Sequence, residues 1–133
     1  MTFLLDTDIC SFAMKRRFAG LEERLLQFDS GELKVSAATE YELQVGALKR
    51  GNSDHLQRVI GKFLSLVEVL DFDRDAARNA AAVRARLEQA GRPLGAMDML
   101  IAGHALSIGA TLVTNSVREF SRVEGLTVEN WAG

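Results

Sequence analysis

The chain has 133 residues, of which 47% are hydrophobic and 26% charged, and its formal net charge is −2. This size and composition suit one folded domain with its own core and exclude a disordered polar chain. The charge argues against a protein held on nucleic acid by overall positive charge. The single cysteine, Cys10, excludes an internal disulfide and a Cys/His metal cluster, and we expect it to be a small buried hydrophobic residue.

No stretch of the sequence has the properties of an export or membrane segment. The amino terminus lacks the basic residues and the apolar run of a secretory signal, and no run reaches the roughly 18 apolar residues that a membrane span needs. No repeat, low-complexity segment or linker divides the chain. We therefore expect one domain over residues 1–133, in a cytoplasmic protein that does not bind a membrane.

The first element is a short apolar run at residues 2–5 that stops at two carboxylates, Asp6 and Asp8. Its length and composition predict a strand buried on both faces, as in the middle of a parallel sheet. The residues from Ile9 onward have helical character, so the turn from strand to helix falls near Asp6. Ligands of open α/β sheets bind beyond the carboxyl ends of the strands, and Asp6 would lie in that place.

The middle of the chain predicts a helix at 21–28, a second short strand at 33–36 and a helix at 38–50. On the helix at 38–50, an apolar stripe is expected to form the packed face, and Glu42 borders that stripe. The stripe consists of Ala38, Tyr41, Val45 and Leu48.

The second half continues the alternation of helices and strands, with a helix at 54–66, a strand at 67–70 and a helix from Asp73 to Gly91. A nearly all-apolar helix then begins at Ala96 and carries Asp98 as its only carboxylate, which implies burial on most sides. The remaining expected elements are a strand at 111–114, a turn at 118–120 and an edge strand at 126–128. This order predicts an α/β fold, with a central parallel sheet of four to five strands flanked by helices on both faces.

Three acids stand out, and each also has an ordinary structural explanation. Asp6 is a natural helix cap, Glu42 a half-exposed helix residue, and Asp98 an anion favoured at a helix amino terminus. If all three meet at one sheet edge, however, each pair at about 4 Å costs on the order of 4 kcal/mol at an effective dielectric near 20. Protonation would relieve this repulsion, and so would a hard cation such as Mg²⁺ or Mn²⁺.

Four short segments together resemble the motifs of PIN-domain ribonucleases, in the same order and spacing. They are residues 4–8 (LLDTD), 39–43 (TEYEL), 98–102 (DMLIA) and 114–120 (TNSVREF). More narrowly, the chain resembles the VapC toxins of type II toxin-antitoxin systems from residue 3 to Trp131. Any one of these motifs alone would be a weak signal.

The resemblance implies a PIN fold and a Mg²⁺- or Mn²⁺-dependent endoribonuclease in which Asp6, Glu42 and Asp98 are the catalytic, metal-binding acids. It also implies a VapB-like antitoxin as partner, a homodimer that forms a higher assembly with the antitoxin, and RNA as substrate. Relatives with a similar carboxyl-terminal sequence cut initiator tRNA in the anticodon loop. The fourth acidic position of the family holds Ser116 here, so we name Ser116 and Glu119 as candidate further metal ligands. Asp8 stands where the family commonly has Asn.

Basic side chains that could hold RNA phosphates are the cluster at residues 15–17 together with Arg84, Arg86, Arg92 and Arg118. Solvated helix faces and helix ends are the simpler explanation of any one of these clusters. His104 lies about a third of a turn around its helix from Asp98, and we interpret it as a packed or capping residue rather than as a catalytic base.

Two other functions fit parts of the sequence. Asp6 and Asp8 match the Asp-x-Asp opening of haloacid-dehalogenase-like phosphatases, but the lysine and the later acidic pair of that family are not evident. Ser116 at the fourth acidic position is compatible with a non-catalytic PIN-like module that binds RNA or antitoxin without cutting.

Overall fold

A computed structural model describes residues 1–132 and contains one parallel sheet in the order β3-β2-β1-β4-β5. Every strand is short, as expected for strands buried between helices. The strands are β1 (Phe3–Leu5), β2 (Leu33–Ser36), β3 (Glu68–Leu70), β4 (Thr111–Val113) and β5 (Val128–Glu129). The predicted domain over 1–133 includes Gly133, which lies outside the described residues.

Helices fill the connections between the strands. They are α1 (Thr7–Met14), α2 (Ala19–Leu26), α3 (Ala37–Lys49), α4 (Asp54–Leu64), α5 (Arg74–Gln89), α6 (Ala96–Ser107) and α7 (Val117–Phe120), with a 3₁₀ turn, η1 (Ser30–Glu32), before β2. Side-chain caps begin several of them: Ser53 accepts from Leu56 N at 3.1 Å and Asp73 from Ala76 N at 2.9 Å. The predicted α/β class with a parallel sheet of four to five strands is confirmed, and the sheet has five.

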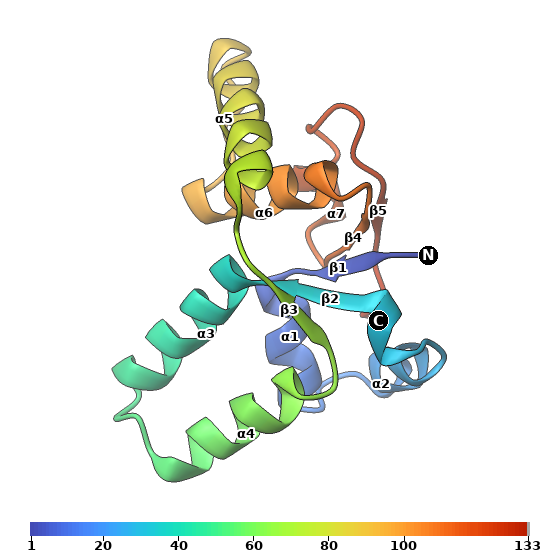
Figure 1. Ribbon diagram of the computed structural model, residues 1–133, viewed down its shortest axis with the longest axis vertical. Coiled ribbons are helices and arrows are strands. Elements are labelled where there is room, and N and C mark those ends of the chain that lie inside the picture. The colour runs from blue at the N-terminus through green and yellow to red at the C-terminus, as the bar shows by residue number, and fades with distance from the viewer. Residues whose placement is uncertain (133) are drawn as a thin grey trace.

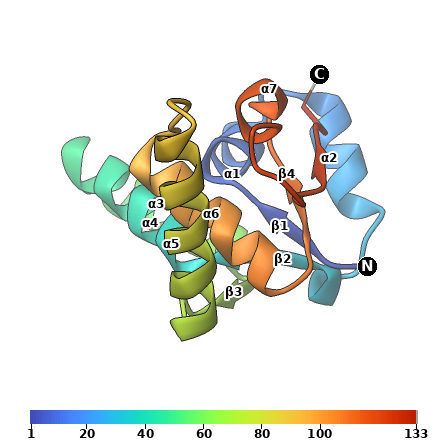
Figure 2. The ribbon, with the colours of Figure 1, turned by 90° about the horizontal axis from the view of Figure 1, so that it is seen from above.

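The sheet has a hydrophobic core on each face. Alternate residues of β1 point to opposite sides, so Phe3 and Leu5 belong to the core under α1–α4, whereas Leu4 belongs to the core under α5–α7. Figure 1 shows these two helical layers above and below the strands, and Figure 2 shows α5 packed on α6. This arrangement leaves the carboxyl ends of the strands as the edge at which loops meet.

The strand register brings polar residues together at that edge. Leu5 pairs with Val113, and Leu4 pairs with Lys34, so Asp6 and Thr114, which directly follow β1 and β4, lie at the same edge as Ser36, the last residue of β2. All three side chains are buried. Three residues that are distant in sequence therefore lie side by side at the place where α/β proteins bind ligands.

The packing face predicted for α3 is wrong. Tyr41 and Leu48 are each 61% exposed, whereas the helix packs through Thr39, Leu43 and Ala47. Thr39 can be buried because its hydroxyl pairs with that of Thr7, whose own hydrogen goes to Glu42, and Ala47 is small enough for the helix to approach its neighbours closely. The apolar stripe in the sequence predicted the wrong face, because exposed apolar side chains are common on soluble proteins.

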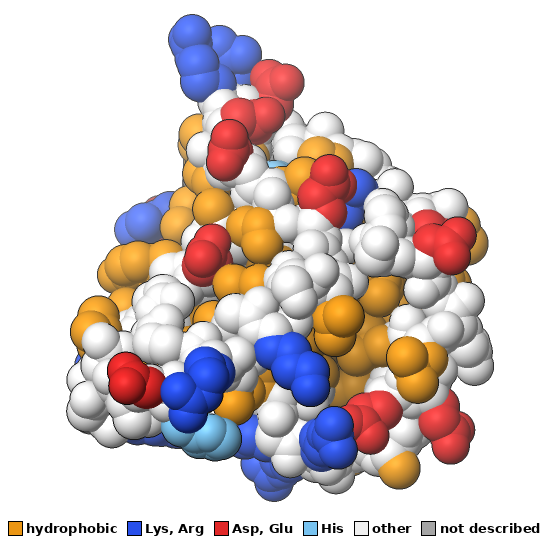
Figure 3. Space-filling model, turned by 60° about the horizontal axis from the view of Figure 1, so that its bottom comes forward, with side chains coloured by type: hydrophobic (Ala, Val, Ile, Leu, Met, Phe, Trp, Pro, Cys, Tyr) orange, Lys and Arg blue, Asp and Glu red, His pale blue; other side chains and the backbone are white. Residues whose placement is uncertain are grey.

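The surface of the α1–α4 layer mixes apolar and basic side chains. Figure 3 shows hydrophobic patches between lysines and arginines on this side of the molecule. Several half-buried hydrophobic residues pack against the core there, including Phe12, Met14 and Phe63. Within residues 1–132, no helix combines the length and the apolar character that crossing a membrane requires.

Candidate active site

Asp6 is the most buried acid of the sheet edge, with 4% of its surface exposed. It caps α1, because its Oδ1 accepts a hydrogen bond from the backbone N–H of Ile9 at 2.9 Å, and it also accepts one from the Thr114 side chain. Burial raises its pKa from 3.8 to about 7, and the charges of Asp8 and Asp98 add to this rise. The helix-cap explanation and a functional role are therefore both compatible with its position.

Glu42 is half-buried on the second turn of α3 and is held from the neighbouring helix. Thr7, the first residue of α1, donates a short hydrogen bond to Glu42 Oε1, and its Oγ1 lies 3.2 Å from Thr39 Oγ1. Because Thr7 follows Asp6 directly, this contact ties the position of Glu42 to that of Asp6.

Asp98 lies half-buried in the first turn of α6, whose N-cap residue, Gly95, has no side chain to cap the helix. A Cβ atom on Gly95 would lie 3.6 Å from Asp98 Oδ2, so the loop passes close to the carboxylate. Burial raises the pKa of Asp98, and the charges of Glu42, Asp8 and Glu119 raise it further.

These electrostatic effects define an acid cluster of five residues: Asp6, Asp8, Glu42, Asp98 and Glu119. Within residues 1–132, no ion pair involves any of the five, and no lysine or arginine is among the causes of the two pKa shifts. Carboxylates that repel one another without a basic partner are a donor set that fits a hard divalent cation. In their present rotamers, no three His, Cys, Asp or Glu side chains of the described residues converge at one ligating point.

The two candidates for the fourth ligand differ in their surroundings. Ser116 is half-buried, and its backbone N–H donates to Thr114 Oγ1 at 2.9 Å, which orients the hydroxyl that bonds Asp6. Glu119 is exposed on α7, and its charge acts on Asp98. The structure thus brings Glu119 into the acid cluster and places Ser116 beside a residue that supports Asp6.

Three residues of this site were not chosen from the sequence as site residues. Thr7 and Thr114 hold two of the acids by hydrogen bonds, and the charge of Asp8 acts on both Asp6 and Asp98. Thr114 follows a strand, as Asp6 does, so its position after β4 was the available signal. The role of Thr7 depends on a contact between α1 and α3, which no local pattern reports.

Two buried residues near the site behave as predicted. Cys10 is fully buried, and burial raises the pKa of its thiol well above 9.0. His104 is 1% exposed, its Nδ1 lies 2.8 Å from Ser36 Oγ, and the Phe72 ring packs edge-on against it at 5.4 Å. His104 is therefore a packed residue on a different face of α6 from Asp98.

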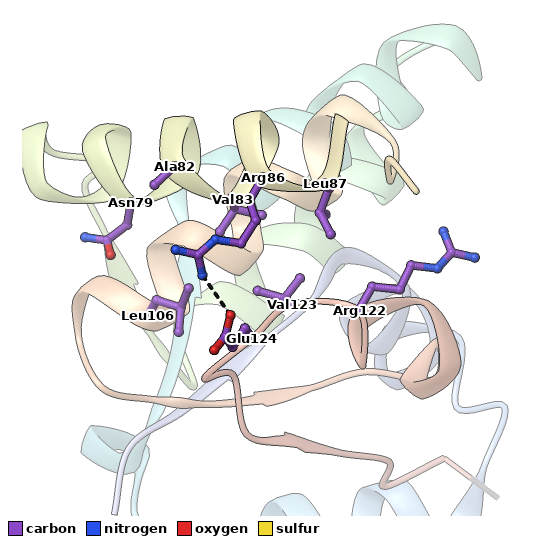
Figure 4. A pocket seen from close by; sticks show the side chains of 9 residues that line it. All are labelled: Asn79, Ala82, Val83, Arg86, Leu87, Leu106, Arg122, Val123 and Glu124. Carbon is purple, nitrogen blue, oxygen red and sulfur yellow. Dashed lines mark hydrogen bonds and ion pairs between the residues drawn. The ribbon is translucent and has the colours of Figure 1, made fainter. Parts of the chain in front are cut away.

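Some of the arginines proposed to bind RNA phosphates already form ion pairs within the protein. Arg84 pairs with Glu88 at 3.0 Å, and Arg86 pairs with Glu124 at 3.2 Å. Figure 4 shows the second pair at a cavity of about 150 Å³ between α5, α6 and the segment after α7. No residue of the acid cluster lines this cavity, whose lining includes apolar side chains such as Val83. Arg118, next to Glu119 on α7, is the basic candidate nearest to the cluster in sequence.

Comparison with known proteins identifies a family with the same fold over nearly all of the chain. The PIN domain family matches residues 3–126. The tRNA(fMet)-specific endonuclease VapC of Shigella flexneri is 42% identical over 132 residues, covering 99% of both chains. The DNA-bound VapBC structure from Salmonella typhimurium superposes with a TM-score of 0.93 at 38% identity, covering 99% of both chains. VapBC2 from Rickettsia felis bound to a promoter DNA fragment gives 0.92 at 33% identity, covering 98% of this chain and 99% of that one.

These matches overturn the phosphatase interpretation of Asp6 and Asp8, because the same residues belong to the first motif of a different fold. They confirm the resemblance inferred from the four short motifs. The chain belongs to the PIN-domain family and, within it, to the VapC ribonucleases.

Proposed function

We propose that this protein is a metal-dependent endoribonuclease whose acid cluster holds Mg²⁺ or Mn²⁺. The observation that carries this proposal is the gathering of Asp6, Glu42 and Asp98, from three separate elements, at the carboxyl edge of the sheet without a basic partner. PIN-domain nucleases generally depend on divalent metal. Glu119 joins these three acids as a further candidate ligand, and Ser116 acts through Thr114.

The residues of the cluster have distinct roles in this proposal. A bound divalent cation would polarise a phosphate oxygen and lower the pKa of a water molecule. Asp6 and Asp98 would hold the cation as ionised carboxylates, Thr114 keeps Asp6 in place, and Thr7 keeps Glu42 in place. Hydrolysis in line with the leaving 3′ oxygen leaves a 5′-phosphate and a 3′-hydroxyl, and no protein nucleophile is required.

Initiator tRNA is the substrate that we infer, cut in its single-stranded anticodon loop. The support is the specificity for tRNA(fMet) that the names of the Shigella and Salmonella relatives state, and these relatives match over nearly the whole chain. An RNA loop can splay its bases near the acids while basic side chains hold the flanking phosphates. Arg118 is our first candidate for such a contact, because it lies beside Glu119 in α7.

We infer a VapB-like antitoxin as the protein partner, since several of the matching solved structures are VapBC complexes. The apolar and basic surface of α1–α4 offers area for such a partner (Figure 3). A homodimer, a higher assembly with antitoxin and a cytoplasmic location remain predictions. Light scattering of the protein alone and with antitoxin tests the assembly.

Asp98→Asn tests the proposed function, because it removes a charge with almost no change in volume. We expect cleavage of initiator tRNA to fall by about 10²-fold or more, as for the loss of a group that stabilises the transition state. The exposed variant Asp75→Asn should cleave like the wild type. Purified protein free of antitoxin is assayed with Mg²⁺, Mn²⁺ or chelator, and the new ends are mapped.

Full activity of Asp98→Asn, in a preparation free of contaminating nuclease, would refute the proposed mechanism. Tight RNA binding without cleavage, together with no Mn²⁺ binding by calorimetry, would instead favour the non-catalytic module. Cleavage of elongator tRNAs at the same rate would refute the inferred substrate and leave the nuclease intact.

A further inference from the structure

A buried hydrogen bond joins the two helices that carry Glu42 and Asp98. Nδ1 of His104 on α6 lies 2.8 Å from Oγ of Ser36, which caps the start of α3. Both side chains are almost completely buried, at 1% and 0% exposure. A hydrogen bond between side chains 68 positions apart, in the centre of the molecule, constrains the fold more than a surface contact does.

The hydrogen bond that Ser36 accepts at the start of α3 bears on which atom donates in its contact with His104. Its Oγ accepts a hydrogen bond from the backbone N–H of Ala38 at 3.0 Å, which leaves its single hydroxyl hydrogen free to donate. Within residues 1–132, no buried side-chain nitrogen or oxygen lacks a partner, and His104 Nδ1 is the acceptor within reach of this hydroxyl. We assign the Ser36 hydroxyl as the donor to Nδ1, which corresponds to the neutral tautomer of His104 with its proton on Nε2, and burial lowers the pKa of His104 in the same sense.

The geometry relates this contact to the acids. Glu42 follows Ser36 by six residues along α3, and His104 follows Asp98 by six residues along α6, a distance of about 9 Å along each helix axis. The charge of Glu42 acts on Asp98, so the spacing between these two helices sets the spacing between two acids. The edge-on ring of Phe72 holds the imidazole from the side and fixes its direction.

We propose that His104 and Ser36 are positioning residues: their hydrogen bond sets the separation of α3 and α6 and thereby the geometry of Glu42 and Asp98. This inference rests on the proposed metal-dependent function of the acid cluster. Neither residue touches the reacting atoms in this proposal. A displacement of about 1 Å in a group that positions a reaction can cost about 10²-fold in rate, so one buried bond can matter to an acid 9 Å away.

Four variants separate positioning from stability. Ser36→Ala removes both the helix cap and the bond to His104, whereas the control Ser53→Ala removes an equivalent cap from α4 and no histidine contact. His104→Leu removes the acceptor, and His104→Asn keeps an acceptor near the position of Nδ1. All are measured at a temperature at which circular dichroism and urea titration show the chain folded.

We expect Ser36→Ala and His104→Leu each to lower kcat about 10-fold or more, with KM within about 2-fold, and the double variant to be no worse than the poorer single variant. His104→Asn should recover most of kcat, and Ser53→Ala should leave kcat unchanged. Calorimetry should show that Ser36→Ala and His104→Leu each bind Mn²⁺ about 10-fold more weakly than the wild type, whereas Ser53→Ala binds it as the wild type does. A kcat and Mn²⁺ affinity equal to those of Ser53→Ala would overturn the proposal.

Nuclear magnetic resonance of ¹⁵N-labelled histidines gives a test that needs no activity. The chain has two histidines, and the exposed His55 serves as the reference. We expect His104 to show a protonated Nε2 and an unprotonated Nδ1 in the wild type, and Ser36→Ala to shift the Nδ1 signal. A proton on Nδ1 would overturn the assigned donor, and an Nδ1 signal that is unchanged in Ser36→Ala would overturn the bond itself. A wild type that binds Mn²⁺ but cuts no RNA would refute the proposed nuclease and leave these tests in force.

Discussion

Asp6 has a buried carboxyl group whose hydrogen bonds and neighbours act in opposite directions. Burial and the charges of Asp8 and Asp98 raise its pKa to about 7, although Thr114 and the Ile9 N–H favour the ionised form. A group with this pKa is half protonated near neutral pH and can ionise when a cation offsets the negative charge. Perturbed carboxylates of this kind gather at functional sites, because the fold holds them where their charge is costly.

The free energy of unfolding should therefore fall as pH rises from about 4 to 7 in chelator-treated protein. The unfolded chain releases the Asp6 proton near pH 3.8, whereas the folded chain keeps it until about 7, so the folded state binds more protons in this window. At about 1.4 kcal/mol per pKa unit, the loss attributable to Asp6 is about 4 kcal/mol above pH 7. The raised pKa of Asp98 acts in the same direction.

Urea titrations at several pH values test this expectation. Asp6→Asn should remove most of the dependence on pH and be more stable than the wild type at pH 8, whereas the exposed Asp75→Asn should keep the wild-type dependence. A free energy of unfolding that rises between pH 4 and 7 in both the wild type and Asp6→Asn would show that the carboxyl of Asp6 is ionised throughout.

Helices α5 and α6 are in close contact at a single glycine. A Cβ atom added to Gly103 of α6 would lie 2.3 Å from both the Cα and the N of Ala80 on α5, which is too close for any backbone atom to tolerate. α6 also carries Asp98 and His104, so this contact holds the element that presents an acid to the site. The nearly all-apolar character of α6 seen in the sequence is explained by its position between α5 and the sheet.

Gly103→Ala should lower the free energy of unfolding by about 3 kcal/mol or more, because backbone atoms must move to admit the methyl group. The control Gly61→Ala lies inside α4, where an added Cβ meets nothing within 4 Å, and should raise stability by about 0.5–1 kcal/mol. Urea denaturation of both variants measures the difference. Equal stability of the two variants would show that α5 and α6 are further apart than described.

The molecule as a whole builds the site from both of its layers. Thr7 and Glu42 come from the α1–α4 layer, Asp98 and Glu119 come from the α5–α7 layer, and Asp6 follows the central strand. An ion held by these acids would join the two layers across the carboxyl edge of the sheet. Binding would then favour the folded chain over the unfolded chain by mass action.

Mn²⁺ at about 100 times its dissociation constant should therefore raise the free energy of unfolding by about 2.7 kcal/mol at pH 7.5. The midpoint of thermal unfolding is the measurement, with chelator as the zero point. Asp98→Asn should lose most of this gain, and Asp75→Asn should keep it. An identical rise in both variants would place the ion elsewhere on the chain.

The sequence by itself determined which residues end a strand or start a helix. The run before Asp6, the cap at Asp73 and the glycine at Gly91 are local signals, since each depends on backbone preferences within a few residues. From these signals the α/β class and the parallel sheet could be predicted, whereas Glu42 was singled out beside an apolar stripe that the fold leaves partly exposed.

Only the tertiary structure decided which side chains hold the acids and which face of α3 is buried. Thr7 supports Glu42 and Thr114 supports Asp6 because separate elements meet at one edge, and Tyr41 is exposed because Thr39 and Ala47 take the packed face. Hydrogen bonds and burial between distant segments depend on distances across the fold, whereas periodicity reports only the repeat along one element.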